Sequence, residues 1–252
     1  RARMIYAHRG ASFELPENTI EAFALALEIG ADALETDAHM TRDGHVVLSH
    51  DPTGEHCAGV KRAIADASFS EVRSWDVGAR FQPRRPGKFT AGVRYRMPTL
   101  EEALEAFPSI YFNVDAKQTE PDMIPALLRA VDRCGAASRV RIASFSGRNL
   151  RRVRRRGYAG ETGMSPGEVA RLMFLPRPAL RWYRPSGDAA QVPRRAYGIA
   201  FDRQSAIDRF HAVGLRVDFW TIDDPAEARR LLAMGADGIM TDDVRAVVAS
   251  GS

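Results

Sequence analysis

The feature that most constrains this chain is a regular alternation of short apolar runs with segments of helical spacing. The first apolar run, Met4–Ala7, precedes a helical pattern between Ile20 and Leu27, with Asn18 as its expected N-cap. The same order returns roughly eight times. Strands joined by crossover helices build parallel sheets, so the sequence predicts an α/β fold. Later strands are expected at Ala33–Ala38, Ile110–Asp115, Val140–Phe145, Glu161–Met164, Tyr197–Phe201, Arg216–Ile222 and Gly238–Met240, with residues 176–196 irregular.

Length and loop composition bear on how these units are arranged. A closed (β/α)8 TIM barrel commonly has about 250 residues, and this chain has 252. An open doubly wound sheet is the alternative, but no glycine-rich phosphate loop follows the first predicted strand. Residues 52–96 interrupt the alternation with glycines and prolines, and only Ser70–Trp75 looks helical there. We therefore predict one TIM-barrel domain over residues 1–252, with a small insertion at 52–96 after the second barrel strand.

Bulk composition limits the compartment and the kind of partner. Cys57 and Cys134 are too few for a disulfide framework, which favours free thiols, although a single bridge stays open. No apolar run is long enough to span a bilayer. No signal peptide is visible, so we expect a cytoplasmic protein, with peripheral membrane contact and export left open. The net charge of +4, carried almost wholly by arginine on the positive side, permits an anionic partner.

Carboxylates stand at the ends of the predicted strands, where barrel enzymes carry their catalytic groups. Glu35 and Asp37 are two residues apart on one strand, so their side chains share a face. Two adjacent carboxylates resist ionising together, and a bound cation removes that conflict. Asp115, from a third strand, would complete an all-oxygen site suited to Mg²⁺ or Ca²⁺. Solvated acids at the barrel mouth are the alternative that spacing leaves open.

Two histidines at strand ends suit acid–base chemistry on a phosphodiester. His8 and His50 could lie on opposite sides of phosphorus, one deprotonating the attacking hydroxyl and one protonating the leaving oxygen. Neighbours on a strand point to opposite faces, so we do not expect Asp51 to orient His50. His39 shares the strand face of the two carboxylates and is expected near the pocket. Two further histidines are interpreted as structural groups, namely His56 and His211.

Cationic and aromatic side chains would hold the substrate. Arg9 and Lys117 are candidates for binding phosphate oxygens, with salt bridges to the clustered acids as the alternative. Phe145 and Trp220 could form an apolar wall for the alcohol or lipid part of the substrate. Core packing is the alternative for both and the favoured interpretation of Phe145.

An ordered set of short motifs now points to a family. The chain closely resembles the glycerophosphodiester phosphodiesterase family, and the likeness covers nearly the whole length. Each motif alone is weak, but the ordered set is highly specific. The motifs are His8-Arg9-Gly10, Pro16-Glu17-Asn18-Thr19, Glu35-Thr36-Asp37, Thr41-Arg42-Asp43-Gly44, His50-Asp51, Pro98-Thr99-Leu100-Glu101-Glu102, Asn113-Val114-Asp115-Ala116-Lys117, Ser144-Phe145, Trp220-Thr221 and Gly238-Ile239-Met240-Thr241-Asp242.

The resemblance implies a barrel phosphodiesterase with a divalent cation, Mg²⁺ or Ca²⁺. Its metal ligands would be Glu35, Asp37 and Asp115, and its general acid and base His8 and His50. Arg9 and Lys117 would contact the phosphate. In the family's proposed mechanism, the glycerol hydroxyl of the substrate attacks phosphorus, and water then opens the cyclic phosphate. The products would be glycerol 3-phosphate and an alcohol.

One departure from the family pattern changes the expected substrate. Many members have Glu where this chain has Asp115, and Asp is similar to the lysophospholipase D-like branch and to sphingomyelinase D-like enzymes. The stretch 169–176, followed by Trp182 and Tyr183, looks like an apolar loop of that branch. It could seat an acyl chain or touch a membrane, with a buried barrel helix as the alternative. A lysophospholipid is therefore the second expected substrate class.

Two other functions are weighed against hydrolysis. An arginine cluster suggests a solvated helix face, or else binding to anionic lipid, while no motif supports nucleic-acid binding. An inactive barrel that binds anionic ligands is the alternative of another class, and the intact set of acids and histidines argues against it. The cluster comprises Arg148, Arg151, Arg152, Arg154, Arg155 and Arg156.

Overall fold

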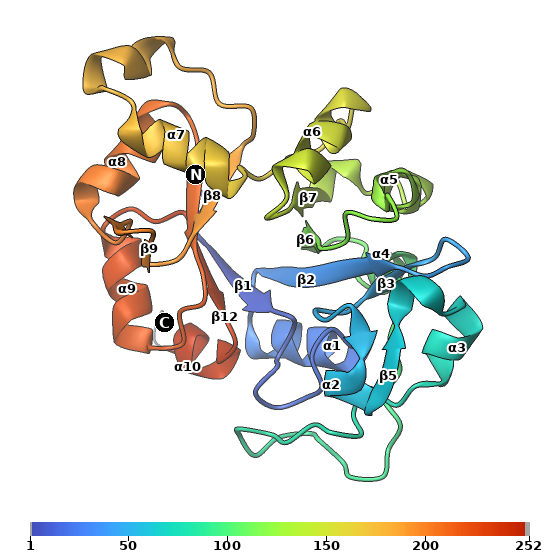
Figure 1. Cartoon of the computed structure of the whole chain (residues 1–252). Helices are drawn as coiled ribbons and strands as arrows, with labels where there is room; N and C mark the ends of the chain where they lie inside the picture. The colour runs from blue at the N-terminus through green and yellow to red at the C-terminus, as the bar shows by residue number, and fades with distance from the viewer. Residues whose placement is uncertain (1, 250–252) are drawn as a thin grey trace.

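A curled parallel sheet forms the centre of the molecule. In a computed structural model that describes residues 2–249, seven parallel strands follow one another in the order β7-β6-β2-β1-β12-β11-β8 (Figure 1). They are β1 (Met4–His8), β2 (Ala33–Met40), β6 (Tyr111–Ala116), β7 (Val140–Ala143), β8 (Ala189–Val192), β11 (Arg216–Phe219) and β12 (Gly238–Thr241).

Residues 162 and 163 close this sheet into a barrel. Parallel bridges join Ile142 to Thr162 and Gly163 to Ala189, so the short run between them links β7 to β8. It lies within the predicted strand Glu161–Met164. The predicted TIM barrel is therefore confirmed, with its eighth parallel segment reduced to bridge residues.

The predicted barrel strand Tyr197–Phe201 is wrong. The strand in that position is β8, inside the stretch expected to be irregular, and its buried Ala-Ala-Gln-Val sequence lacks the bulky apolar run that marks a strand. Downstream, β9 (Arg195–Ala196) and β10 (Ile199–Ala200) form a small antiparallel hairpin. Its turn residues, Tyr197 and Gly198, both have positive φ, as tight two-residue hairpin turns require.

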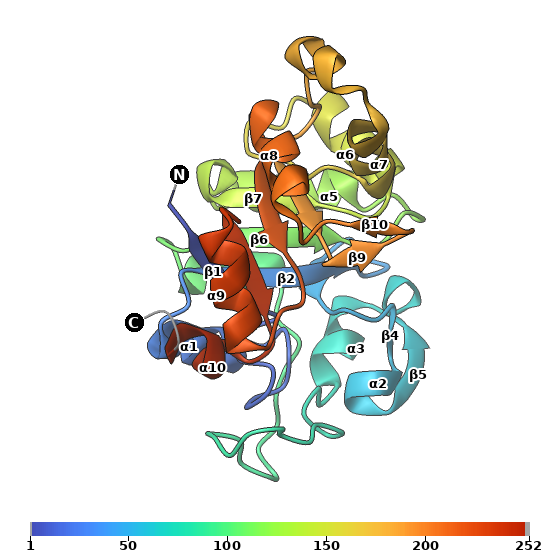
Figure 2. The same cartoon turned by 90° about the vertical axis from the view of Figure 1, so that its left-hand side faces the viewer.

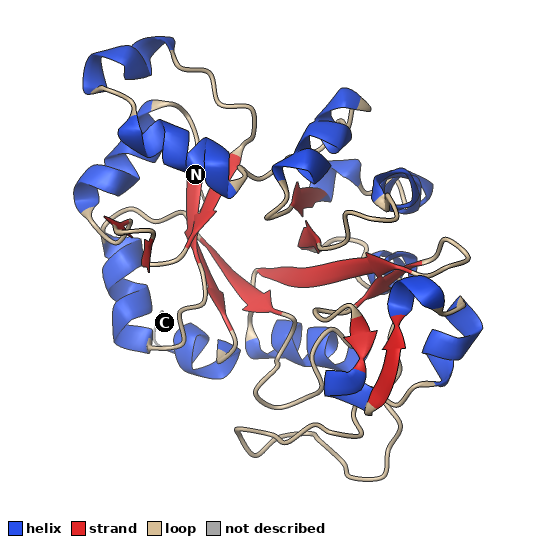
Figure 3. Ribbon diagram, viewed as in Figure 1, coloured by secondary structure: helices blue, strands red, loops and turns tan. Residues whose placement is uncertain are grey.

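Helices surround the barrel on the outside (Figures 2 and 3). The first of them is capped by Thr19, whose hydroxyl accepts a hydrogen bond from the Ala22 amide, so the expected cap at Asn18 is wrong. No helix within residues 2–249 is both long and apolar enough to cross a membrane. The helices are α1 (Ile20–Ile29), α4 (Leu100–Ala106), α5 (Ile124–Arg133), α6 (Gly147–Arg155), α7 (Pro166–Phe174), α8 (Gln204–Ala212), α9 (Pro225–Ala233) and α10 (Val244–Ala249).

The insertion between β2 and α4 contains more regular structure than expected. Side chains such as Val72, Trp75, Tyr95 and Met97 are buried in the same core as the barrel helices, which is why we propose one domain rather than two. Strand β3 (Val46–Leu48), which pairs antiparallel with β2, precedes residue 52. Within residues 52–96, α3 (Phe69–Ser74) lies at the expected helix, and the unexpected elements are β4 (Thr53–Gly54), α2 (Glu55–Ala58) and β5 (Val60–Ala63). Short 3-10 turns complete the chain at η1 (Ile64–Asp66), η2 (Ala137–Arg139) and η3 (Arg177–Trp182).

A buried ionic cluster fills the barrel near the N-terminal ends of its strands. Arg141, only 1% exposed, lies 2.6 Å from Asp218 Oδ2 and 3.0 Å from Glu161 Oε2. Tyr111 donates its hydroxyl to the same Glu161 oxygen, and the guanidinium stacks near the Tyr6 and Tyr111 rings. These pairs join four separate strand positions across the barrel interior, so the floor below the site is built from paired charges.

Candidate active site

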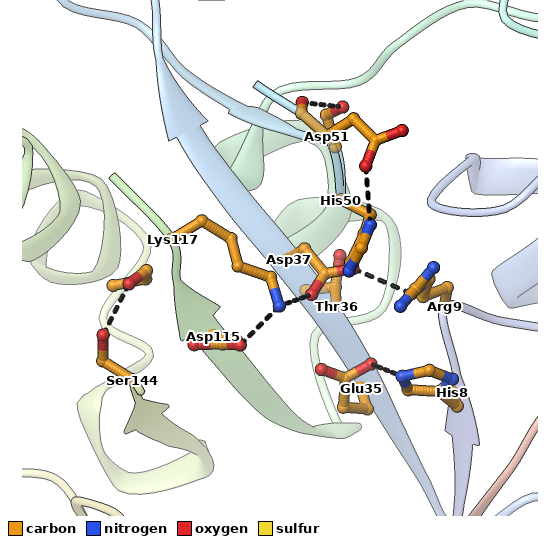
Figure 4. A network of polar contacts seen from close by, with 12 residues as sticks. His8, Arg9, Glu35, Thr36, Asp37, His50, Asp51, Asp115, Lys117 and Ser144 are labelled. Atoms are coloured by element: carbon orange, nitrogen blue, oxygen red, sulfur yellow. Dashed lines mark hydrogen bonds and ion pairs between the residues drawn. The ribbon is translucent and has the colours of Figure 1, made fainter. Parts of the chain in front are cut away.

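A cavity of about 570 Å³ opens at the C-terminal ends of the barrel strands. All nine residues that the sequence singled out as catalytic, metal-binding or substrate-binding line it (Figure 4 shows seven of them). The parallel barrel explains this convergence, because the carboxyl ends of all its strands meet at one rim. The nine are His8, Arg9, Glu35, Asp37, His50, Asp115, Lys117, Phe145 and Trp220.

Three buried carboxylates lie on neighbouring strands. Asp37 on β2 is directly beside Asp115 on β6 in the strand register, and Glu35 is beside His8 on β1. Lys117 Nζ lies between two of them, 2.9 Å from Asp37 Oδ1 and 2.7 Å from Asp115 Oδ2. The acids are therefore buried rather than solvated, and Lys117 adopts the salt bridges foreseen as its alternative.

The three carboxylates differ in how their charge is balanced. Burial acts to raise the pKa of Asp37, but Lys117 and Arg9 outweigh it and hold that pKa below its usual value. Burial, reinforced by Asp37, raises the pKa of Glu35. Burial also raises the pKa of Asp115, since Lys117 compensates only in part. The cations of the site therefore stabilise the charged form of Asp37 but not fully that of Glu35 and Asp115.

The donor set fits a hard divalent cation. Glu35 Oε2 and Asp115 Oδ1 are buried and have no hydrogen-bond partner among the described residues. Unpaired buried carboxylate oxygens are costly, and Mg²⁺ and Ca²⁺ prefer oxygen ligands of this kind. Lys117 now lies between Asp37 and Asp115. Within residues 2–249, no three acidic, histidine or cysteine side chains lie close enough together to coordinate a metal ion in this arrangement.

His8 has a carboxylate partner that the sequence did not indicate. Its Nδ1 lies 2.7 Å from Asp242 Oδ1, at the end of β12, and Ser12 donates its hydroxyl to the same oxygen. Nε2 faces Glu35 Oε2 at 3.7 Å, beyond hydrogen-bonding distance. Burial acts to lower the pKa of His8, but Glu35 and Asp242 together raise it to about 8. The sequence did offer one signal for this partner, since Asp242 directly follows the last barrel strand and therefore stands at the same rim as His8.

His50 also has a carboxylate partner, and here the expectation about Asp51 was wrong. His50 Nδ1 lies 2.9 Å from Asp51 Oδ1. Strand β3 ends at Leu48, so the alternation of faces no longer applies at residues 50 and 51. His39 lies behind the cavity, where its Nε2 is 3.3 Å from the His50 carbonyl oxygen. Both candidate catalytic imidazoles are therefore held through Nδ1.

The histidines interpreted as structural stay outside the site. His56 is exposed in the insertion, and His211 lies 2.8 Å from Asp237 on the outer helix α8. Neither lines the cavity. Cys57 and Cys134 are both free thiols, as the low cysteine count favoured.

Asp37 is fixed by two neighbours on the β1–α1 segment. Arg9 Nε lies 3.0 Å from Asp37 Oδ2, and its Nη1 is 3.1 Å from Glu17. Asn18 donates its amide to Asp37 Oδ2 at 3.3 Å and accepts a hydrogen bond from Thr36. Asn18 therefore orients a carboxylate of the site instead of capping α1.

The far side of the cavity is apolar. Phe145 is 61% exposed and packs edge-on against Trp220 with ring centroids 5.6 Å apart, so the favoured interpretation of Phe145 as core is wrong. Lys117 Nζ lies 5.6 Å from the Phe145 ring centre. The wall continues along α7 and the β9–β10 hairpin with Met164, Val169, Phe174, Tyr197, Ile199 and Phe201.

A comparison with family models gives this geometry a context. Residues 8–246 match the model described as the glycerophosphoryl diester phosphodiesterase family. The chain belongs to this family. Membership confirms the family and the phosphodiesterase class expected from the sequence.

Individual relatives agree. A Mycobacterium tuberculosis protein named "probable glycerophosphodiester phosphodiesterase 2" is 34% identical over 95% of this chain and 87% of its own length. A Homo sapiens protein named lysophospholipase D GDPD1 is 28% identical over 94% and 82%. The fold is shared with a phosphodiesterase of Oleispira antarctica, solved in complex with the product sn-glycerol-3-phosphate. That structure has a TM-score of 0.78 and 20% identity, and the match covers 99% of this chain and 96% of that one.

Proposed function

We propose that this enzyme hydrolyses glycerophosphodiesters to glycerol 3-phosphate and an alcohol. The observation that carries the proposal is the pair of histidines, His8 and His50, each held through Nδ1 by a carboxylate and each lining the cavity beside Lys117 and Arg9. Acid–base chemistry on a phosphodiester needs two such groups and an anion-binding environment. Family relatives with this activity in their names, and the product held by the Oleispira antarctica enzyme, support the same substrate class.

In this mechanism the two imidazoles handle opposite ends of the reaction. One, neutral, takes the proton of the attacking glycerol hydroxyl through Nε2, and the other, protonated, donates to the leaving oxygen. Asp242 and Asp51 keep the Nδ1–H on each ring, which leaves Nε2 for the substrate. Water then opens the cyclic phosphate with the roles exchanged. No protein nucleophile is required.

We further propose that Glu35, Asp37 and Asp115 hold a divalent cation, Mg²⁺ or Ca²⁺. When bound, the cation supplies positive charge that polarises the phosphate and balances the buried carboxylates. Lys117, whose ammonium lies between Asp37 and Asp115, would pair with a phosphate oxygen together with Arg9 once the cation balances those acids. Asp115 is shorter than Glu by one methylene, so its free oxygen reaches less far from β6.

The test is release of glycerol 3-phosphate from glycerophosphocholine with Mg²⁺, with Ca²⁺ and with EDTA. We expect turnover with at least one cation, none with EDTA, and a loss of about 10²–10⁴-fold in His8→Ala and His50→Ala. His56→Ala, an exposed histidine outside the cavity, is the matched control and should retain full activity. Turnover that survives EDTA, or that persists in both histidine variants, contradicts the mechanism. Phosphate binding without turnover on any diester favours the inactive binding barrel instead.

The apolar wall of the cavity favours a second candidate, lysophospholipase D activity. A small head group would leave much of the wall uncovered, and one relative carries that activity in its name. Comparing lysophosphatidylcholine with glycerophosphocholine separates the two. Preference for the acylated substrate should be lost in Phe174→Ser and Ile199→Ser, which change the wall, and kept in Val93→Ser, an exposed apolar position in the insertion. Equal rates on both substrates in the wild-type enzyme would exclude this candidate.

A further inference from the structure

Charge is distributed very unevenly along the chain. Residues 145–200 hold twelve arginines and three acidic residues, so this segment carries a net charge of +9, whereas the whole chain carries +4. The remaining residues together are therefore acidic. This asymmetry is not explained by the site, whose cations Arg9 and Lys117 lie elsewhere in the sequence.

The basic segment is gathered on one side of the barrel mouth. It runs through α6, α7, η3 and the β9–β10 hairpin, and its α7 and η3 part lies on the side away from the insertion in both views (Figures 1 and 2). Its inner surface forms the apolar wall of the cavity, since Val169, Phe174 and Ile199 all line it. The same elements thus present one surface to the substrate and another to the outside.

Large apolar side chains protrude from this segment. Of the five that are most exposed among the described residues, four belong to it: Phe145, Phe174 at 76%, Trp182 at 66% and Tyr197 at 91%. Phe174 and Tyr197 stand at the cavity, so the protruding group is continuous with the site. A contiguous group of exposed aromatic side chains marks an interaction surface, whereas single exposed apolar residues are normal on any protein.

The arginines around these aromatics are not neutralised. Between residues 171 and 200, five of the six arginines are exposed and form no ion pair with any residue between 2 and 249, in contrast to Arg194, which is paired with Glu227 at 2.9 Å. One of the five, Arg181, lies over the Trp182 ring with its guanidinium carbon 3.7 Å from the ring centre. The five are Arg171, Arg177, Arg181, Arg184 and Arg195.

We propose that this basic rim, formed by those five arginines with Phe174, Trp182 and Tyr197, docks on an anionic lipid bilayer. Aromatic rings partition into the interfacial layer of a membrane, and arginines beside them are attracted to acidic head groups. Docking there turns the mouth of the cavity toward the bilayer, so a lipid-derived phosphodiester reaches the apolar wall without leaving the interface. Proteins that bind single-stranded nucleic acids stack the bases on aromatic side chains along a basic groove. Here the aromatics protrude beside a pocket, which favours a membrane over a nucleic acid.

Vesicle co-sedimentation tests the proposal without any turnover, so failure of the proposed activity does not affect it. Wild-type protein is mixed with phosphatidylcholine vesicles and with phosphatidylcholine–phosphatidylglycerol vesicles, at low and at high salt. We expect binding only to the anionic vesicles, weakened by salt. A triple variant, R177Q/R181Q/R184Q, should bind at least about tenfold more weakly, and Trp182→Ser should also bind more weakly.

The matched control is R42Q/R94Q/R96Q, which removes the same charge from three exposed arginines outside the basic segment. It should bind anionic vesicles like wild type. None of the altered side chains lines the cavity, so glycerophosphocholine hydrolysis in free solution should be unchanged in every variant. Equal loss of binding in the two triple variants, no binding to anionic vesicles, or tighter binding to RNA or DNA than to vesicles would each overturn the proposal.

Discussion

Replacing Asp242 with Asn tests how the site controls His8. The carboxylate accepts the His8 Nδ1–H at 2.7 Å and is itself fixed by Ser12. Its backbone is anchored as well, because Asp223 accepts from the Asp242 amide at 2.8 Å. An amide of the same shape keeps the packing but can turn its NH₂ toward Nδ1. The imidazole would then carry its proton on Nε2, and the ring could no longer accept a proton there.

The expected magnitude follows from this one contact. A hydrogen bond to a charged group contributes about 1.5–3 kcal/mol. Each 1.36 kcal/mol changes a rate about tenfold, so Asp242→Asn should lower kcat by about 10- to 150-fold. The Asp242 side chain is mostly shielded from solvent, so screening by water reduces this range only slightly. The loss should appear mainly in kcat, because Asp242 does not line the cavity.

Steady-state hydrolysis of glycerophosphocholine between acidic and alkaline pH is the assay. Asp243→Asn is the matched control, since that neighbouring carboxylate pairs with Arg85 and not with a histidine. It should leave kcat within about twofold of wild type, because neither Asp243 nor Arg85 lines the cavity. A wild-type kcat and pH profile in Asp242→Asn would refute the assignment of Asp242 as a positioning residue. An equal loss in Asp243→Asn would show that the β12–α10 loop as a whole is sensitive to substitution.

Three further predictions follow from other contacts. Arg141→Met leaves the buried Asp218 without the guanidinium that lies 2.6 Å from its carboxylate. This substitution should lower the free energy of unfolding, measured in urea, by about 3–5 kcal/mol. A loss under about 1 kcal/mol would contradict a structural role for the ionic cluster. Asn18→Ala removes one of the contacts that orient Asp37 and should weaken activation by Mg²⁺ or Ca²⁺ about 10- to 100-fold, measured by metal titration of activity, whereas unchanged activation would argue against Asp37 as a ligand. Partial burial acts to raise the pKa of Glu168, but hydrogen bonds from Arg154 and Ser165 hold that pKa below its ordinary value of 4.5. A depressed carboxylate pKa stabilises the fold above the ordinary value and this stabilisation is lost as pH falls below it, so thermal melts should show Glu168→Gln less stable than wild type at neutral pH and the gap narrowing below about pH 4.5. A gap independent of pH would contradict this.

Much of the architecture could be predicted because it depends on local patterns. Buried parallel strands have short runs of apolar residues, and outer helices have apolar residues at helical spacing. Both patterns are present for most of the barrel. The apolar signal failed at β8, because its sequence Ala-Ala-Gln-Val contains only one bulky apolar residue. It also failed at residues 197–201, where the apolar residues belong to the β9–β10 hairpin and not to a barrel strand. The insertion was recognised from its glycines and prolines, but its hairpin and α2 were not, since such short elements have no period to detect.

The residues that line the cavity could be predicted from the sequence, because the barrel brings every strand end to one rim and the chemistry-bearing residues stand at those ends. All nine predicted residues line the cavity for that reason. Several of the partners of these residues could not be predicted, because they come from distant parts of the chain. The contact between His8 and Asp242 joins residues 234 positions apart, and no local pattern encodes it. The tertiary structure likewise places Asn18 against Asp37 and brings Phe145, Phe174 and Tyr197 to the cavity, because side-chain neighbours across a closed barrel depend on strand order and register.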